Sequence, residues 1–149
     1  MKRALFMAAL MVAELPGTAW AAAVCTASAT PLAFGTIDPL GSTITSNGTI
    51  TVACTGGATA ATYTVKLSAG NSGSFATRQM KSGTNTLNYN LYTSSALSTI
   101  WGDATGGSSS VTGTNTKVTS NFSVYGKVPT PQAVTPSSYS DSITVTVTY

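Results

Sequence analysis

The last nine residues of the chain alternate strictly between apolar and polar side chains. The apolar positions are Ile143, Val145, Val147 and Tyr149, and a serine or threonine lies between each pair of them. A period of two, built from β-branched and aromatic residues, is typical of a strand with one buried face. The pattern therefore predicts a final half-buried strand whose inward face consists of these four residues.

No turn signal and no further strand pattern follow this segment in the printed sequence. The final strand is therefore expected either to pair with an earlier segment or to leave an apolar edge open. An open edge of this kind is a template for the strand of another chain. Which of the two arrangements holds decides the function.

Shorter segments with the same period recur through the rest of the chain. Strands are predicted over 25–34, where Pro31 interrupts the pattern, and over 48–54, 61–68, 75–80, 85–92 and 121–126. The Gly-rich segments 70–74 and 106–116 are predicted to be exposed loops and are the candidate adhesion surfaces. No helical period of 3.6 residues appears after residue 21. About seven short strands separated by turns indicate an all-β fold, an Ig-like β-sandwich.

The N-terminus has the three parts of a secretory signal peptide. Two basic residues precede a nearly continuous apolar run over 4–12, and Ala19 and Ala21 form a small-x-small cleavage pattern. A membrane anchor needs about 20 apolar residues, whereas this run is shorter and a glutamate follows it. We therefore expect 1–21 to be a signal peptide and 22–149 to be a single mature domain.

Export places Cys25 and Cys54 in an oxidising compartment, where a disulfide between them is expected. The alternative is a pair of free buried thiols. The full chain has a net charge of +3, and its few charged residues are scattered along the sequence. Nucleic acids and anionic membranes are recognised by basic patches, and none is present.

The sequence offers few groups for catalysis. It contains no histidine, which excludes a Ser–His triad and histidine-ligated zinc. Asp103 and Asp141 are the one candidate glycosidase pair, although each aspartate, like Asp38, also has the position of a turn former. No Gly-rich phosphate loop follows a strand and opens a helix. We therefore expect no enzymatic activity, no metal and no cofactor.

Several segments, taken together in order and spacing, resemble the spore coat protein U domain family, which includes the pilin subunits of archaic chaperone–usher pili. The resemblance covers essentially the whole chain after residue 21. The segments are a first cysteine strand ending in Phe-Gly (25–35), a second cysteine strand (50–54), Arg78-Gln-Met80, Leu87 to Tyr92, Trp101-Gly-Asp103, Val124 to Pro129 with Gln132, and 139–149.

The resemblance implies an incomplete sandwich that lacks its final strand. A periplasmic chaperone would lend a strand, an outer-membrane usher would pass the subunit on, and the N-terminal segment of a neighbouring subunit would fill the groove by donor-strand complementation. The acceptor groove would include Ile143, Val145, Val147 and Tyr149. The expected product is a non-catalytic structural subunit of a pilus, fibre or coat, secreted through the periplasm to the cell surface.

One departure from the family pattern lies before the first cysteine. Only Ala22 to Val24 separate the expected cleavage site from Cys25. Three residues span roughly 10 Å, whereas a donor strand needs about 5–6 residues. The chain is therefore expected to accept a strand without donating one, as at a pilus tip. The alternative is a self-complete secreted sandwich, a coat or ligand-binding protein, in which 26–32 fold back into the groove.

Overall fold

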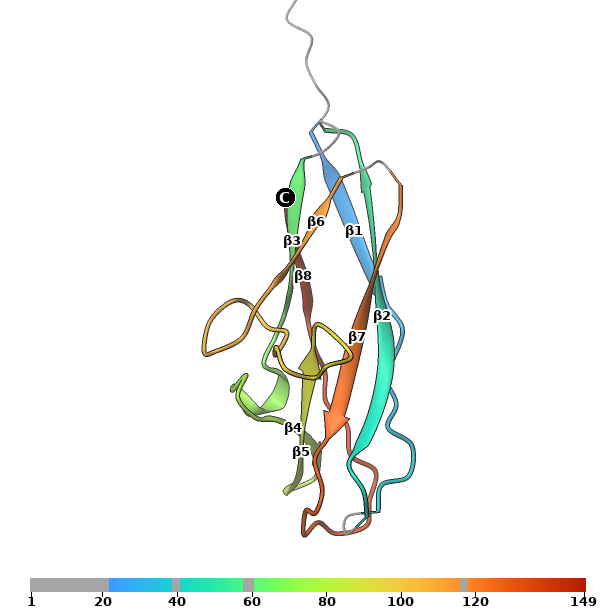
Figure 1. Ribbon diagram of the computed structural model, residues 1–149, viewed down its shortest axis with the longest axis vertical. Helices are drawn as coiled ribbons and strands as arrows, with labels where there is room; N and C mark the ends of the chain where they lie inside the picture. The colour runs from blue at the N-terminus through green and yellow to red at the C-terminus, as the bar shows by residue number, and fades with distance from the viewer. Residues whose placement is uncertain (1–21, 39–40, 58–60, 116–117) are drawn as a thin grey trace, which may run out of the picture.

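The computed structural model describes residues 22–38, 41–57, 61–115 and 118–149. The predicted signal peptide, with Ala19 and Ala21, lies outside them. The described residues form an elongated all-β sandwich (Figure 1). Its elements are β1 (Val24–Ala29), β2 (Ile44–Thr55), β3 (Thr62–Leu67), the 3₁₀ turn η1 (Gly70–Ser72), β4 (Arg78–Ser82), β5 (Asn85–Tyr92), β6 (Val111–Thr114), β7 (Ser120–Val128) and β8 (Val145–Thr148).

The strands form two antiparallel sheets. The larger sheet has the order β1-β2-β7-β5-β4, and the smaller one has the order β6-β3-β8. The predicted sandwich class is confirmed, and so is the single disulfide between Cys25 and Cys54. Within the described residues, no helix is long and apolar enough to cross a membrane.

The core lies between the two sheets and follows the period-two pattern of the sequence. Alternate residues of each central strand point inward and are almost completely buried, which is what a pleated strand with one apolar face requires. Trp101 is 1% exposed, and its indole N–H donates to the Val65 carbonyl at 3.1 Å. The buried apolar residues are Ile50, Val52, Cys54, Tyr63, Val65, Leu67, Met80, Leu87, Tyr89, Leu91, Trp101, Val124 and Val128.

The structure differs from the predicted elements in several places. The strand predicted over 25–34 ends at Ala29. Residues 111–114 form β6, so the prediction of a loop over the whole of 106–116 is wrong. This strand has little apolar alternation of its own and is held by pairing with β3. The predicted strand over 75–80 is shifted to 78–82, and the final strand is restricted to 145–148.

Two irregular segments run along the end of the molecule opposite the disulfide (Figure 1). One follows β1 and covers residues 30–37, and the other covers 132–141 before β8. Ser140 exchanges two backbone hydrogen bonds with Lys81 of β4, at 2.8 and 3.0 Å. Ser68 then binds the backbone of Thr144 on the β3 side. The C-terminal segment thus crosses from the edge of the larger sheet to the edge of the smaller one.

Candidate strand-accepting groove

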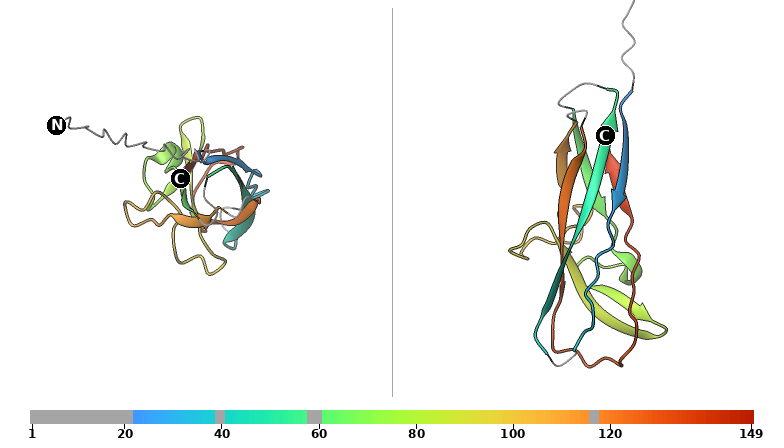
Figure 2. Two further views of the ribbon diagram at one scale, coloured as in Figure 1. Left: turned by 90° about the horizontal axis from the view of Figure 1, so that it is seen from above. Right: turned by 90° about the vertical axis from the view of Figure 1, so that its right-hand side faces the viewer.

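The first and last strands each have an edge that no strand pairs with in the described residues. β1 is hydrogen-bonded only to β2, and β8 only to β3. The two free edges face each other along one side of the sandwich, where Figure 2 shows β1 and β8 next to each other and the chain segments below them diverging. An unpaired strand edge presents a row of backbone donors and acceptors.

Two cavities lie between these diverging segments. The first has a volume of about 370 Å³, and the second, nearer the end opposite the disulfide, has a volume of about 530 Å³. The first is lined by Ala29, Thr30, Pro31, Leu32, Phe34, Gly48, Thr49, Ile50, Leu67, Met80, Tyr89, Leu91, Val124, Tyr139, Ser140, Asp141, Ile143 and Val145. We call the two cavities together the groove.

The four residues predicted to form an acceptor groove have different positions. Ile143 and Val145 line the first cavity and are half-buried. Val147 is also half-buried and packs against the core from the same face of β8. Tyr149 follows the strand and is 58% exposed. The alternation seen in the sequence is present, and its first two apolar positions lie at the groove.

Four residues line both cavities, and among them only Leu32 belongs to the segment 26–32 that was expected to enter the groove in the alternative hypothesis. Leu32, Phe34, Met80 and Tyr139 line both cavities and therefore lie at the boundary between them. For Leu32 and Phe34, the signal was the loose alternation over 25–34 that continues after Pro31. It was interpreted as the continuation of an edge strand, whereas 30–37 leaves the regular sheet.

Asp141 is the one charged residue among those that line either cavity in the described structure. Its carboxylate accepts the Tyr89 hydroxyl at 2.7 Å and the backbone N–H of Asn71 at 2.9 Å. Burial of the Tyr89 ring raises the pKa of that phenol, and its hydrogen bond to Asp141 raises the pKa further. The carboxylate therefore ties η1 and β5 to the segment before β8.

A buried cation, Arg78, lies next to the residues that Asp141 holds together. Arg78 is 0% exposed and donates to the Ser68 carbonyl at 2.8 and 3.1 Å, to the Trp101 carbonyl at 2.6 Å and to Asn90 Oδ1 at 2.8 Å. Its guanidinium also lies over the Phe75 ring, 5.4 Å from the centroid. Burial lowers the pKa of this arginine. Arg78 of β4 therefore holds the loops that follow β3 and β5 by hydrogen bonds.

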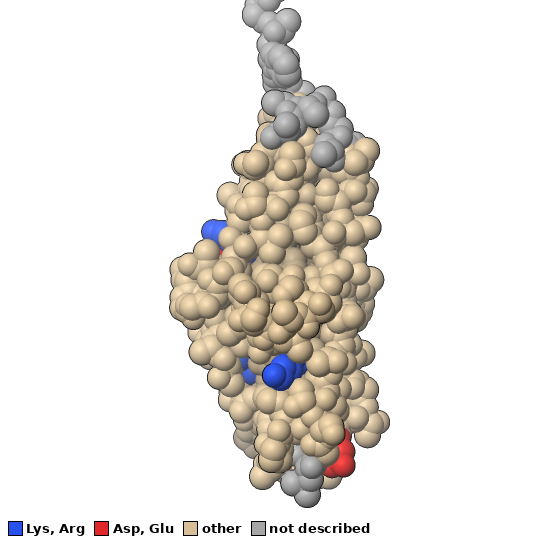
Figure 3. Space-filling model, viewed as in Figure 1, with Lys and Arg blue, Asp and Glu red and all other residues tan. Residues whose placement is uncertain are grey.

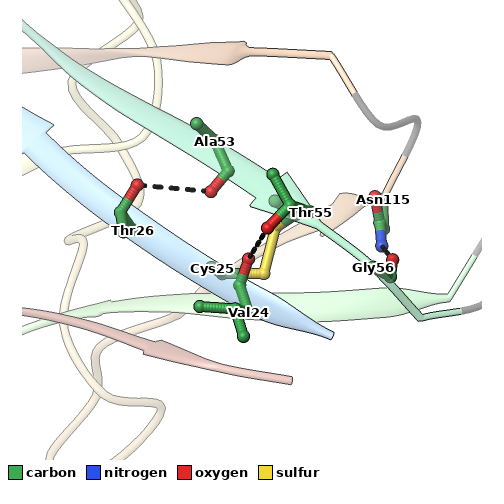
Figure 4. The surroundings of a disulfide bond; sticks show 8 residues. Val24, Cys25, Thr26, Ala53, Thr55, Gly56 and Asn115 are labelled. Atoms are coloured by element: carbon green, nitrogen blue, oxygen red, sulfur yellow. Dashed lines mark hydrogen bonds between the residues drawn. A yellow bond between two sulfur atoms is a disulfide. The ribbon is translucent and has the colours of Figure 1, made fainter. Parts of the chain in front are cut away.

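The disulfide closes the other end of the sandwich. Cys25 and Cys54 are directly opposite each other in the β1–β2 register, as Figure 4 shows. On the same strands, Thr26 donates to the Ala53 carbonyl at 3.4 Å. The first residues of β1 are therefore fixed to β2, both covalently and by backbone pairing.

The two aspartates considered as a catalytic pair have different hydrogen-bond partners in the described residues. Asp103 accepts two hydrogen bonds from Thr105, at 2.6 and 2.9 Å, and the bond from the hydroxyl holds the pKa of Asp103 below its usual value. Asp141 has the separate partners given above, so Asp103 holds its own turn and Asp141 joins distant segments. No group of three or more His, Cys, Asp or Glu residues is placed to hold a metal ion in the described residues.

The charged side chains on one face of the molecule are scattered (Figure 3). Figure 3 shows one face on which isolated basic and acidic residues lie among uncharged ones. This distribution agrees with the scattered charges of the sequence. It offers no concentrated charge on that face for a nucleic acid or an anionic membrane.

Comparison with known proteins gives one family. The model of the spore coat protein U domain matches residues 10–146. No curated protein sequence matches the chain. The fold is similar to a chain in the crystal structure of the CsuC–CsuE chaperone–tip adhesion subunit pre-assembly complex from archaic chaperone–usher Csu pili of Acinetobacter baumannii, with a TM-score of 0.61 and 21% identity. The match covers 86% of this chain and 40% of that chain, and at this identity it shows the fold alone.

Proposed function

The chain belongs to the spore coat protein U domain family, and we propose that it is a non-catalytic surface-fibre or coat subunit that accepts an extended strand from another protein. The observation that carries this proposal is the pair of free strand edges, β1 and β8, on either side of an apolar groove. Strand addition uses backbone hydrogen bonds for affinity and pockets for alternate side chains for specificity. The groove offers both.

The proposed partners follow the order of assembly. A periplasmic chaperone lends the first strand, an outer-membrane usher receives the subunit, and a neighbouring subunit replaces the chaperone's strand. The similar fold in the Csu complex was solved together with a chaperone, which supports the first of these steps. Residues 1–21 would direct the chain through the periplasm to the cell surface.

Co-expression in a periplasm tests strand acceptance. The mature chain is produced with and without a chaperone of the archaic chaperone–usher type and then purified. We expect the chain to co-purify with the chaperone and to be degraded or aggregated without it. A stable, protease-resistant monomer made without chaperone or donor peptide would refute the proposal.

A matched pair of variants locates the contact. Ile143→Glu introduces a negative charge into the first cavity, where the one charged lining residue is also an acid, Asp141, whereas Thr144→Glu introduces the same charge at the neighbouring exposed position. A buried unpaired charge is strongly unfavourable. We expect the Ile143 variant to lose co-purification and the Thr144 variant to keep it. Equal behaviour of the two variants would place the chaperone elsewhere.

The second candidate, a self-complete sandwich, has one observation in its favour and one against it. Leu32 and Phe34 fill part of the groove from within the chain. However, residues 26–29 pair with β2, so only the last residues of the expected segment 26–32 line the groove.

The mature N-terminus is tested separately by intact mass. Cleavage after Ala21, with Ala19 and Ala21 as the small residues, gives a mature chain that begins at Ala22. The expectation that the subunit accepts but does not donate a strand depends on this mass. A mature chain that starts well before Ala19 would contradict the expectation that the subunit has no donor segment.

A further inference from the structure

We infer that this chain fills one part of its own groove with Leu32 and Phe34, so that the partner supplies only a short strand of about five residues. This inference rests on the proposed function and specifies the partner's segment. A longer donor strand would have to displace the two side chains. Three observations carry the inference: a glycine floor, a boundary between two cavities, and a narrow approach of β1 to β8.

Two buried glycines inside regular strands form the surface on which the side chains of Leu32 and Phe34 pack. Gly48 of β2 is directly opposite Val124 of β7, and Gly126 is two residues further along β7, so both glycines face the same side of the sheet. Neither has the positive φ that would otherwise favour glycine. Glycine inside a strand marks a place where another part of the structure approaches closely.

The approaching side chains are those of residues 32 and 34. A Cβ atom built on Gly126 would lie 2.8 Å from both Leu32 Cδ2 and Phe34 Cζ, and one built on Gly48 would lie 3.5 Å from the Leu32 Cβ. The Phe34 ring also meets the Tyr89 ring edge-on, with centroids 6.0 Å apart. The two side chains therefore extend from the edge segment across β2 and β7 toward β5.

The side chains of Leu32 and Phe34 close one end of the first cavity. Leu32 and Phe34 belong to the lining of both the 370 Å³ and the 530 Å³ cavity. The facing wall at this boundary is provided by Tyr139, from the other irregular segment. A strand that lies in the first cavity therefore meets apolar side chains of this chain before it reaches the second.

The other end of the first cavity is limited by backbone. Cα atoms of β1 and β8 come within 8 Å of one another, whereas a strand inserted between two others needs a separation of roughly 9.6 Å, twice the spacing of paired strands. Between the Leu32–Phe34 boundary and the close approach of β1 to β8, the first cavity is bordered by residues 29–31 on one side and 141–145 on the other. Opposite 141–145, a donor of about five residues fits, with apolar side chains at alternate positions.

Synthetic peptides of two lengths test the inference. The short probe is Thr-Val-Thr-Val-Thr, and the long probe continues the same alternation to eleven residues. Each carries a terminal lysine and a fluorophore, and binding to the mature chain is measured by fluorescence anisotropy. We expect the Kd values of the two probes for the natural chain to agree within about threefold, because only the first cavity is available.

Two variants open the boundary in different ways. The double variant Leu32→Ala, Phe34→Ala removes the two side chains, and Gly126→Ala places a methyl group where they lie. In both we expect the long probe to bind at least tenfold more tightly than the short one. Ser123→Ala, at an exposed position of β7 that lines neither cavity, is the control and should behave like the natural chain.

Hydrogen exchange on the natural chain gives a test that needs no variant. With the short probe bound, segments 26–31 and 141–149 should gain protection, and segments 33–38 and 134–138 should not. Protection of the latter segments would overturn the inference. So would a long probe that binds the natural chain tenfold more tightly than the short one, or equal binding of both probes to every variant. If neither probe binds the natural chain at all, the proposed strand acceptance itself fails.

Discussion

Replacing Arg78 by methionine should destabilise the fold more than any change at an exposed cation. The side chain is fully buried and gives hydrogen bonds to the carbonyls of Ser68 and Trp101 and to the side chain of Asn90. Methionine has a similar length and no donor. The variant therefore keeps most of the packing and removes the hydrogen bonds.

The magnitude follows from the acceptors that remain. Asn90 Oδ1 keeps a second donor, the Leu91 backbone N–H at 3.0 Å, so it is not left unpaired. The carbonyls of Ser68 and Trp101 lose the donors that the structure gives them, and each buried unsatisfied acceptor costs about 1–3 kcal/mol. Removing a buried cation recovers part of its desolvation penalty. We expect a net loss of about 2–4 kcal/mol in the free energy of unfolding.

Urea-induced unfolding of the mature chain, followed by tryptophan fluorescence and extrapolated linearly to water, measures this loss. Lys81→Met is the control, because Lys81 is on the same strand and exposed. Its effect should stay within about 0.5 kcal/mol. An Arg78→Met variant that also stays within about 0.5 kcal/mol would show that the network contributes no net stability, and it would refute the argument.

Three further predictions concern stability. The raised pKa of Tyr89, caused by burial and by its bond to Asp141, means that the folded state holds this proton after the unfolded state has lost it. Stability is therefore complete below about pH 10 and falls above it by about 1.4 kcal/mol per pH unit; alkaline unfolding of Tyr89→Phe should lack this component, and equal slopes would contradict the assignment. Among the described residues the buried Tyr63 hydroxyl has no hydrogen-bond partner, so Tyr63→Phe should be neutral or stabilising in urea, and a clear loss would indicate a bound water. Reduction of Cys25–Cys54, 29 residues apart in sequence, should lower the unfolding free energy by roughly 3–4 kcal/mol, and a loss below about 1 kcal/mol would show that β-pairing alone holds this end.

The strands that were predicted well carry their own signal. Residues such as Val65 in β3 and Leu87 in β5 alternate with polar neighbours over five or more positions, and a period of two decides both the element and its buried face. The disulfide was predictable because export and two cysteines leave one pairing. β6 was missed because its four residues contain Gly113 and threonines, and pairing with β3 holds them.

The polar contacts of the site depend on residues far apart in the chain, which sequence patterns do not report. Asp141 was assigned a turn because it precedes a strand, yet its carboxylate binds Tyr89 and Asn71, which are 52 and 70 residues away. Arg78 likewise binds two loops outside its own strand. Its acceptors at Ser68 and Trp101 were not identifiable, since both are backbone carbonyls.

The length of the groove also depends both on a local sequence pattern and on contacts between residues far apart in the chain. The alternation at Ile143 and Val145 predicts that these residues form one wall of the groove. It does not indicate whether the space opposite that wall is empty or filled by other side chains. Whether that space is filled depends on Leu32 and Phe34, and they reach it because Gly126 lacks a side chain. In a single sequence, Gly126 has the same appearance as a residue that weakens a strand or marks a bulge. The role of Gly126 can be recognised only in the folded structure, where β7 lies next to the segment that follows β1. The packing of Leu32 and Phe34 against Gly126 limits the length of the strand that a partner supplies.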